Sequence, residues 1–367
     1  MRRTEAIAWV VSVCSCSLRL SQAKTLAALV ASAMRVERVS LANLGRRMLG
    51  NAKHQIKRCW RFCNNGRVEP ADAMRGVVAR LVRKRKKPLL VALDWVDIKG
   101  FQTLVASAVL KGRSAPLCWA SCEGHTYDGQ RSRNAFEESL LLVLRSMVPA
   151  EAGVRVILLA DRGFGRAALA AFCRRQGFSY LIRIQPKVTV KLKGFCGKLL
   201  DYPIRKGIAR VLKDVAYRAD GAVEQHVVVR WKHGLPPKRD ECWFLMTDLK
   251  GTAHQLCALY ARRMTIEQLF RDHKSKRNGW SLRDTQLKTP QRLDRLLLVL
   301  ALAYLLLCGL GLIAQKTHRP SAWCSSSKEL CSIFVIGLLM RDKLKASPAQ
   351  AFAAVLELHD SLVAKWG

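Results

Sequence analysis

Two short apolar stretches, each ending in an aspartate, decide the fold. Residues 89–95 read Leu-Leu-Val-Ala-Leu-Asp-Trp, and residues 154–161 read Val-Arg-Val-Ile-Leu-Leu-Ala-Asp. Apolar runs of this length predict strands that are buried on both faces of a sheet. Asp94 and Asp161 then lie at strand ends, where open α/β sheets place their binding sites. The sequence therefore predicts an α/β fold with two carboxylates at the carboxyl ends of its strands.

The chain around these two strands follows the order β-β-β-α-β-α-β. We expect the further strands at 101–110, 115–120 and 178–184, and the helices at 134–147 and 166–176. From residue 186 to residue 247 the pattern is strand-like with turn breaks, which indicates a β-rich insertion. Helical periodicity returns at 254–274 and again at 291–314.

The first 80 residues have helical periodicity and a basic face. Apolar residues recur at three-to-four spacing in 24–36, 40–48 and 51–63, and Ser40 is the expected N-cap of the second helix. The third helix carries the positive groups Lys53, His54, Lys57, Arg58 and Arg61. A solvated helix face carries similar charges, but we interpret this segment as part of a helical DNA-binding unit.

The net charge of the chain indicates a polyanionic partner. Of 367 residues, 63 are Lys or Arg and 27 are Asp or Glu, which gives a formal net charge of +36. A compact protein with this charge repels itself unless a polyanion lies close to it. Nucleic acid, an anionic membrane surface and polyphosphate all fit. We favour nucleic acid because the basic residues are spread over segments that are predicted to fold.

One apolar run has nearly the length of a membrane span. Residues 296–314 carry no charge, and about 20 apolar residues cross a bilayer as a helix. A buried helix of a large α/β core has the same composition. Since no second span accompanies this run, we expect a core helix and no membrane partner.

A third acid belongs to a polar group on the predicted helix 254–274. The group consists of Tyr260, Arg263, Glu267 and Lys274. Successive spacings of 3, 4 and 7 residues place these side chains within an arc of roughly 60°. A solvated stripe of salt bridges has similar spacing. The combination with Asp94 and Asp161 favours a site instead.

Three carboxylates that converge on one site repel each other unless cations bind there. Hard oxygen ligands select Mg²⁺ or Mn²⁺, and two such ions about 3.5–4 Å apart catalyse phosphodiester displacement. The charge and the acids together therefore indicate two-metal phosphoryl transfer in nucleic acid. Asp97 competes with Asp94 for this role, but an odd offset along a strand directs it to the opposite face.

The pattern Tyr-x2-Arg-x3-Glu-x6-Lys at 260–274 resembles the signature of a group of DDE-type transposases of bacterial insertion sequences, known as the YREK group. Residues 92–98 (ALDWVDI) are similar to the first-Asp strand of this family, and residues 158–166 (LLADRGFGR) to its second-Asp strand and turn. The resemblance covers about residues 20–340. It implies a ribonuclease-H-like catalytic core that a β-rich insertion interrupts.

The resemblance also implies a division of the chain and roles for its residues. The segments are a helical DNA-binding domain (1–82), the first part of the catalytic core (88–185), the β-rich insertion (186–250), and the second part of the core with C-terminal helices (251–367). Asp94, Asp161 and Glu267 would hold two Mg²⁺ or Mn²⁺ ions. Tyr260, Arg263 and Lys274 would contact DNA near the cleavage site.

Trp243 matches a tryptophan that, in a relative, enters the space left by a flipped base. Such a wedge is physically reasonable at a transposon end, although a tryptophan in a strand usually belongs to the core. Both interpretations of Trp243 stay open.

The resemblance implies double-stranded DNA as the partner, both as transposon ends and as target, and a homodimer that bridges two ends. It further implies a cytoplasmic, nucleoid-associated protein. Two other hypotheses remain. The protein could be a non-enzymatic sequence-specific DNA-binding protein, either an inactive transposase copy or a repressor, or a basic membrane-associated protein that uses residues 296–314.

Overall fold

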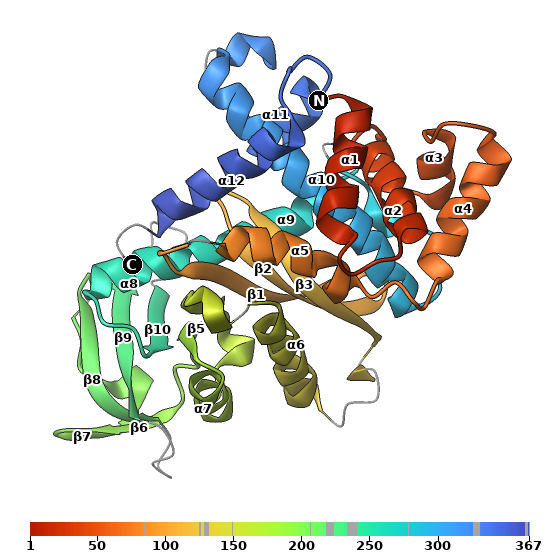
Figure 1. The fold of residues 1–367 in the computed structure, drawn as a ribbon. Helices are drawn as coiled ribbons and strands as arrows, with labels where there is room; N and C mark the ends of the chain where they lie inside the picture. The colour runs from red at the N-terminus through yellow and green to blue at the C-terminus, as the bar shows by residue number, and fades with distance from the viewer. Residues whose placement is uncertain are drawn as a thin grey trace. The chain divides into compact units, whose positions relative to one another are not determined.

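The chain folds into two units, one mainly helical and one built on a β-sheet (Figure 1). The helical unit comprises Met1–Lys87, Trp95–Val154 and Thr265–Gly367, and the sheet unit comprises Pro88–Asp94 and Arg155–Met264. The computed structural model describes residues 1–83, 85–124, 126–127, 132–148, 150–205, 207–217, 224–232, 241–277, 279–325, 331–363 and 366.

Within the described residues, the helical unit begins with five α-helices and ends with four. The first five are α1 (Arg3–Cys14), α2 (Leu20–Ala33), α3 (Leu41–Arg46), α4 (Ala52–Asn64) and α5 (Pro70–Val82). The strands β2 (Phe101–Val109) and β3 (Ser114–Glu123) pair antiparallel and are followed by α6 (Arg133–Met147). The C-terminal helices are α9 (Thr265–Lys274), α10 (Pro290–Thr317), α11 (Ile333–Met340) and α12 (Pro348–Leu362).

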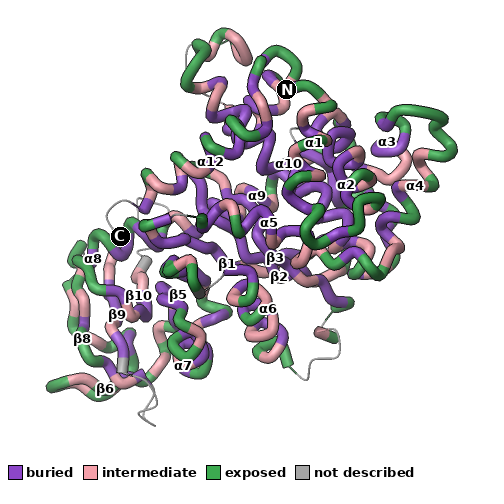
Figure 2. The backbone as a smooth tube through the Cα atoms, in the orientation of Figure 1, coloured by how far each residue is buried: buried purple, intermediate pink, exposed green. Residues whose placement is uncertain are grey.

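The apolar helix α10 forms the centre of the helical unit. It packs against α2, α4, α5, β3, α11 and α12, and it is buried along almost its whole length (Figure 2). Among the described residues it is the one helix whose length and composition would allow a membrane crossing, but 94% of its apolar window is buried inside the protein. It therefore has the burial of a core helix.

Glycines allow α10 to approach its neighbours closely. A Cβ atom on Gly311 would lie 1.8 Å from the carbonyl oxygen of Ile333 on α11, and one on Gly309 would lie 2.2 Å from that of Ala351 on α12. Gly337 of α11 makes the reciprocal approach to the backbone of α10. These helices can pack backbone to backbone only because the three positions lack a side chain.

The sheet unit combines a parallel part with an antiparallel part. Its elements are the first six residues of β1 (Leu89–Ile98), β4 (Val156–Ala160), α7 (Ala167–Arg175), β5 (Phe178–Arg183), β6 (Thr189–Leu192), β7 (Phe195–Lys198), β8 (Ala209–Tyr217), β9 (Glu224–Lys232), β10 (Glu241–Thr247) and α8 (Ala253–Ala261). β1, β4 and β5 pair in parallel, and β10 continues the sheet by antiparallel pairing with β5.

The strand order is β3-β2-β1-β4-β5-β10-β9-β8-β6-β7, a single ten-stranded sheet in which β1 contributes residues to both units. The expected β-β-β-α-β-α-β order and the mixed α/β class are confirmed. The expected cap is confirmed as well, because the Ser40 hydroxyl accepts a 3.1 Å hydrogen bond from the N–H group of Asn43. The strands expected between 186 and 247 belong to this sheet and extend it from β5.

The helix expected at 254–274 is not continuous, and that prediction was wrong. α8 ends at Ala261, a 3₁₀ turn covers Arg262–Met264, and α9 begins at Thr265. No Pro or Gly marks this break in the sequence. The tighter 3₁₀ winding, about 3.0 residues per turn, changes the direction of every side chain beyond it. The arc of roughly 60° calculated for one regular helix does not apply across this turn.

We expect Gly311→Ala to destabilise the helical unit by about 1–3 kcal/mol, because the added methyl group would overlap a backbone carbonyl of α11. Thermal unfolding followed by circular dichroism measures the effect. Gly66→Ala is the matched control, since the nearest atom to its added Cβ would be 3.9 Å away. Equal melting temperatures for the two variants would contradict the role assigned to the close α10–α11 packing.

Candidate active site

The parallel register of β1 and β4 brings Asp94 and Asp161 together. Leu93 of β1 pairs with Ala160 of β4, and the residue that follows each of them is an aspartate. Neighbouring strands lie about 4.8 Å apart, and side chains at equivalent positions point to the same face. The two carboxylates are therefore neighbours. Asp161 directly follows β4, whereas Asp94 follows the last β1 residue that pairs with β4 and lies within β1, which continues to Ile98. The expected strand end at Asp94 was therefore wrong.

The turn after β4 holds Asp161 in place. Its Oδ1 atom accepts a 2.8 Å hydrogen bond from the N–H group of Gly163 and caps the short 3₁₀ turn Arg162–Phe164. Phe164 is fully buried, and a Cβ on Gly165 would lie 2.8 Å from the Arg183 carbonyl oxygen. The sequence Asp-Arg-Gly-Phe-Gly thus anchors the turn on the end of β5.

Asp94 forms an ion pair with Arg263. The Arg263 Nη1 atom lies 2.9 Å from Asp94 Oδ2, and only 9% of the Arg263 side chain and 16% of the Asp94 side chain are exposed. A buried charge is stable only beside a partner of opposite sign. Arg263, which the sequence suggested as a DNA contact, balances the charge of Asp94.

Tyr260 lies within electrostatic range of this ion pair and of Asp161. Burial raises the pKa of Tyr260 to about 12, while Arg263 and Arg183 lower it and Asp161 raises it further. The phenol therefore stays protonated at neutral pH and can donate a hydrogen bond. Arg183 thus acts on the Tyr260 phenol together with Arg263, and the sequence has no signal that would have identified Arg183.

Trp243 packs beside Tyr260. Their rings meet edge to face with centroids 5.4 Å apart. Trp243 is half-buried on β10, and its indole Nε1 is buried without a hydrogen-bond partner among the described residues. A buried indole N–H group usually finds an acceptor. Trp243 is therefore neither a fully enclosed core residue nor a free surface residue.

Asp97 has a different role from Asp94. It is exposed, and its carboxylate accepts hydrogen bonds from the Gly100 N–H group at 3.4 Å and from Gln102 Nε2 at 3.2 Å. These bonds stabilise the turn between β1 and β2, where Lys99 and Gly100 have positive φ angles of 57° and 85°. The structure gives Asp97 a local role in this turn.

In the helical unit, α9 carries Glu267 and Lys274, both half-exposed. Lys274 lies within electrostatic range of Asp97. Burial lowers its pKa, Arg283 lowers it as well, and Asp97 raises it. Glu267 follows Arg263 by four residues along the chain, across the boundary between the two units.

The other face of α9 is anchored by a buried polar network that sequence reasoning missed. Asp272 accepts hydrogen bonds from Arg113 Nε at 2.5 Å and from the Tyr304 hydroxyl at 2.7 Å. Burial raises the pKa of Asp272, and Arg113 lowers it. Breaking such a buried pair typically costs about 3–5 kcal/mol. Asp272 lies five residues after Glu267, or about 140° around a regular helix, so the network fixes the face away from Glu267.

The basic helix α4 presents most of its predicted DNA-binding residues to solvent. Lys53, His54, Lys57 and Arg61 are exposed. Arg58 instead donates two hydrogen bonds to the Thr25 hydroxyl on α2, at 3.1 and 2.9 Å, and joins the two helices. Trp60 is 53% exposed, and the Arg292 guanidinium lies 5.5 Å from its ring centroid.

The chemistry of the two aspartates fits a divalent metal. Adjacent carboxylates offer the hard oxygen ligands that Mg²⁺ and Mn²⁺ prefer. Within the described part of the chain, however, no three His, Cys, Asp or Glu side chains are gathered closely enough to hold a metal ion.

Neighbouring aspartates on adjacent parallel strands, on a strongly basic chain, are features of metal-dependent enzymes that act on nucleic-acid phosphates. The chain matches the family described as "Transposase DDE domain" over residues 86–306, more than half of its length. It therefore belongs to this family, whose members bind DNA and generally use divalent metal ions, and the resemblance to DDE-type insertion-sequence transposases is confirmed. No curated protein matches the chain.

His273, the neighbour of Asp272 on α9, should make the fold acid-sensitive. Burial lowers its pKa to about 3, so below pH ~6.5 the unfolded chain binds a proton that the folded chain does not. The free energy of unfolding therefore decreases as the pH falls from about 6.5 toward 3, by up to about 1.4 kcal/mol per pH unit.

Urea unfolding at pH 7 and pH 5 tests this prediction. The wild-type protein should lose about 2 kcal/mol more than His273→Phe, a change that keeps an aromatic ring beside Trp280 and Tyr304. His54→Phe, at an exposed position, should keep the wild-type dependence. If His273→Phe also keeps it, the buried imidazole is not the acid-sensitive group.

Proposed function

We propose that the protein cleaves transposon ends and joins them to target DNA by two-metal phosphoryl transfer. The observation that carries the proposal is the β1–β4 register, which makes Asp94 and Asp161 neighbours. We assign Glu267 as the third ligand, because it follows Arg263, the partner of Asp94, by four residues. This completes the pattern Tyr-x2-Arg-x3-Glu-x6-Lys, and we place the protein in the YREK group on that basis.

We further propose that segments 88–185 and 251–367 form a ribonuclease-H-like core, that 186–250 is its β-rich insertion, and that 1–82 binds DNA. The strand order β3-β2-β1-β4-β5, with β1, β4 and β5 parallel, supports the core assignment. The exposed basic face of α4, with Trp60 beside it, supports the DNA-binding assignment. Two protomers would bridge two transposon ends.

The residues around the aspartates would have different roles in this reaction. When bound, two divalent ions would activate the attacking oxygen and stabilise the leaving oxygen. Arg263 balances the charge of Asp94 and so reduces the repulsion between the aspartates. The protonated Tyr260 and the basic Arg183 and Lys274 would orient a phosphate of the DNA.

Asp94→Asn, Asp161→Asn and Glu267→Gln should each lower DNA cleavage at least roughly a thousandfold, because each removes one charge from the metal ligands. The assay incubates the purified protein with labelled duplex that spans an end of its own element, together with Mn²⁺. Binding of this duplex should persist in all three variants, although Asp94→Asn should unfold more easily because it leaves Arg263 without its carboxylate.

Asp97→Asn is the matched control, and it should keep most of the cleavage activity. A loss of cleavage in Asp97→Asn together with activity in Asp94→Asn would overturn the assignment. If the wild-type protein binds the end duplex but never cuts it, the non-enzymatic DNA-binding alternative is the better description.

Trp243 would act as a wedge at the flipped base. Trp243→Ala should slow cleavage of an intact end, and much less so when the end carries an abasic site, because unstacking then costs little. Equal slowing on both substrates, with a lower melting temperature, would show that Trp243 serves the packing around Tyr260 instead.

A further inference from the structure

A large basic cleft lies within the helical unit. Its volume is about 970 Å³. Its walls come from the α2–α3 connection, α3 and its C-cap Arg47, the segment after α9, and the end of α11 with the turn that follows. The basic residues that line it are Arg38, Arg46, Arg47, Lys276, Arg277 and Arg341, against the two acids Glu37 and Asp342.

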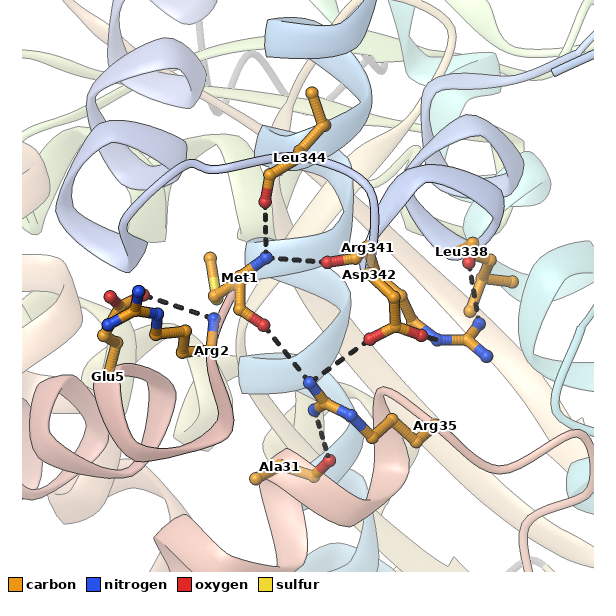
Figure 3. Close-up of polar contacts among 9 residues, drawn as sticks. All are labelled: Met1, Arg2, Glu5, Ala31, Arg35, Leu338, Arg341, Asp342 and Leu344. Atoms are coloured by element: carbon orange, nitrogen blue, oxygen red, sulfur yellow. Dashed lines mark hydrogen bonds and ion pairs between the residues drawn. The ribbon is translucent and has the colours of Figure 1, made fainter. Parts of the chain in front are cut away.

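Much of the acidic charge in the cleft is already balanced. Asp342 lies between two arginines, with Oδ1 3.4 Å from Arg35 Nη2 and Oδ2 3.3 Å from Arg341 Nε (Figure 3). The Arg341 Nη1 atom also donates to the Leu338 carbonyl oxygen at 2.7 Å, which holds its guanidinium at the wall. Asp342 therefore contributes little repulsion toward an anion.

Most of the basic groups in the cleft, by contrast, are not balanced by a close acidic partner. Lys276 lies 3.6 Å from Asp284, a weak surface pair. In the part of the chain that the structure describes, Arg38, Arg46, Arg47 and Arg277 form no ion pair with an acid. All four are exposed. Arginines that converge on a concavity without acidic partners form an anion-binding surface.

Hydrogen bonds give the wall a defined shape. Arg46 Nη1 donates to Asn43 Oδ1 at 3.1 Å, and the Asn43 amide donates to the Arg38 carbonyl oxygen at 3.1 Å. Ser40 caps α3 between them. These bonds fix the backbone that carries Arg38, Arg46 and Arg47, so that three cations lie along one ordered segment.

Trp280 provides an independent sign of a ligand. It lines the cleft, is fully buried, and its indole Nε1 has no hydrogen-bond partner among the described residues. A buried indole N–H group normally donates to an acceptor, which the described residues do not supply here.

The chain runs directly from the end of α9 into the wall of the cleft. Lys276 and Arg277 follow directly after Lys274 at the end of this helix, and Trp280 packs on His273 of the same helix with ring centroids 5.6 Å apart. A polyanion that passes Lys274 would therefore meet the cleft next.

We propose that this cleft binds the phosphate backbone of double-stranded DNA, as a contact separate from Asp94, Asp161 and the basic face of α4. The choice of DNA as the polyanion rests on the proposed function. The charge and shape of the cleft are observed independently of that function. Arg46, Arg47 and Arg277 each neutralise one phosphate.

Salt-dependent DNA binding tests the proposal. The full chain is titrated with a fluorescein-labelled duplex of random sequence, about 30 base pairs long or three helical turns, at several salt concentrations. Arg46→Gln/Arg47→Gln should reduce the slope of log K against log salt by about 1.8, and lower the affinity roughly ten- to hundredfold at ~0.1 M salt. Arg277→Gln, on a different segment, should reduce the slope by about 0.9.

Arg83→Gln/Lys86→Gln is the matched control, since it removes two exposed charges outside the cleft. Its slope should stay near that of the wild type. The proposal is overturned if the cleft and control variants behave alike while all melt at the wild-type temperature. It is also overturned if inorganic pyrophosphate binds with the same dependence on Arg46 and Arg47 while DNA binding is unchanged, because the ligand is then a small polyphosphate.

Cleavage in Mn²⁺ separates this inference from the proposed function. If the wild type cuts DNA and the cleft variant binds like the control, only the cleft assignment fails. In a second outcome, neither the wild type nor any variant cuts DNA, while the cleft variant still binds DNA more weakly and with a smaller salt slope. In that case the DNA-binding role of the cleft holds and the catalytic proposal fails.

Discussion

The parallel pairing of β1 with β4 is the constraint on which the candidate site depends. Because Leu93 and Ala160 are partners, the next residue of each strand is an aspartate, and both point to one face. A shift of one residue in either strand would turn one carboxylate to the other face. The buried runs on both strands fix the register, since both faces of this part of the sheet are covered.

The proximity of two carboxylates has an electrostatic cost, and the sheet unit offsets it with Arg263. Its guanidinium holds Asp94 at 2.9 Å and acts on the buried phenol of Tyr260. The 3₁₀ turn that carries Arg263 separates α8 from α9, so the same turn that supplies the compensating cation also sets the start of the Glu267 helix. The turn Arg262–Met264 thus both balances the charge of Asp94 and sets where α9 begins.

The helical unit distributes its functions around a fixed scaffold. α10 is enclosed on all sides, and glycines bring α11 and α12 against its backbone. α9 is held by Asp272, Arg113 and Tyr304, which leaves its other face for Glu267 and Lys274. The basic surfaces on α4 and in the cleft lie on elements that pack onto this scaffold, so the proposed phosphate contacts would leave the core undisturbed.

The sequence by itself determined the α/β class, the apolar strand that ends before Asp161, the Ser40 cap and the family, because these depend on local periodicity, on turn chemistry and on the spacing of a few residues. It did not determine the end of the strand that carries Asp94, since β1 continues to Ile98. It could not determine the break between α8 and α9, since no Pro or Gly marks it. It also gave no sign of the Asp94–Arg263 pair, the Arg113–Asp272–Tyr304 network or the basic cleft. Each of these joins residues that are distant in the chain, and only the folding of the chain brings their charges together. The tertiary structure decided them because the free energy of a buried charge depends on which groups surround it, and no local pattern in the sequence specifies those neighbours.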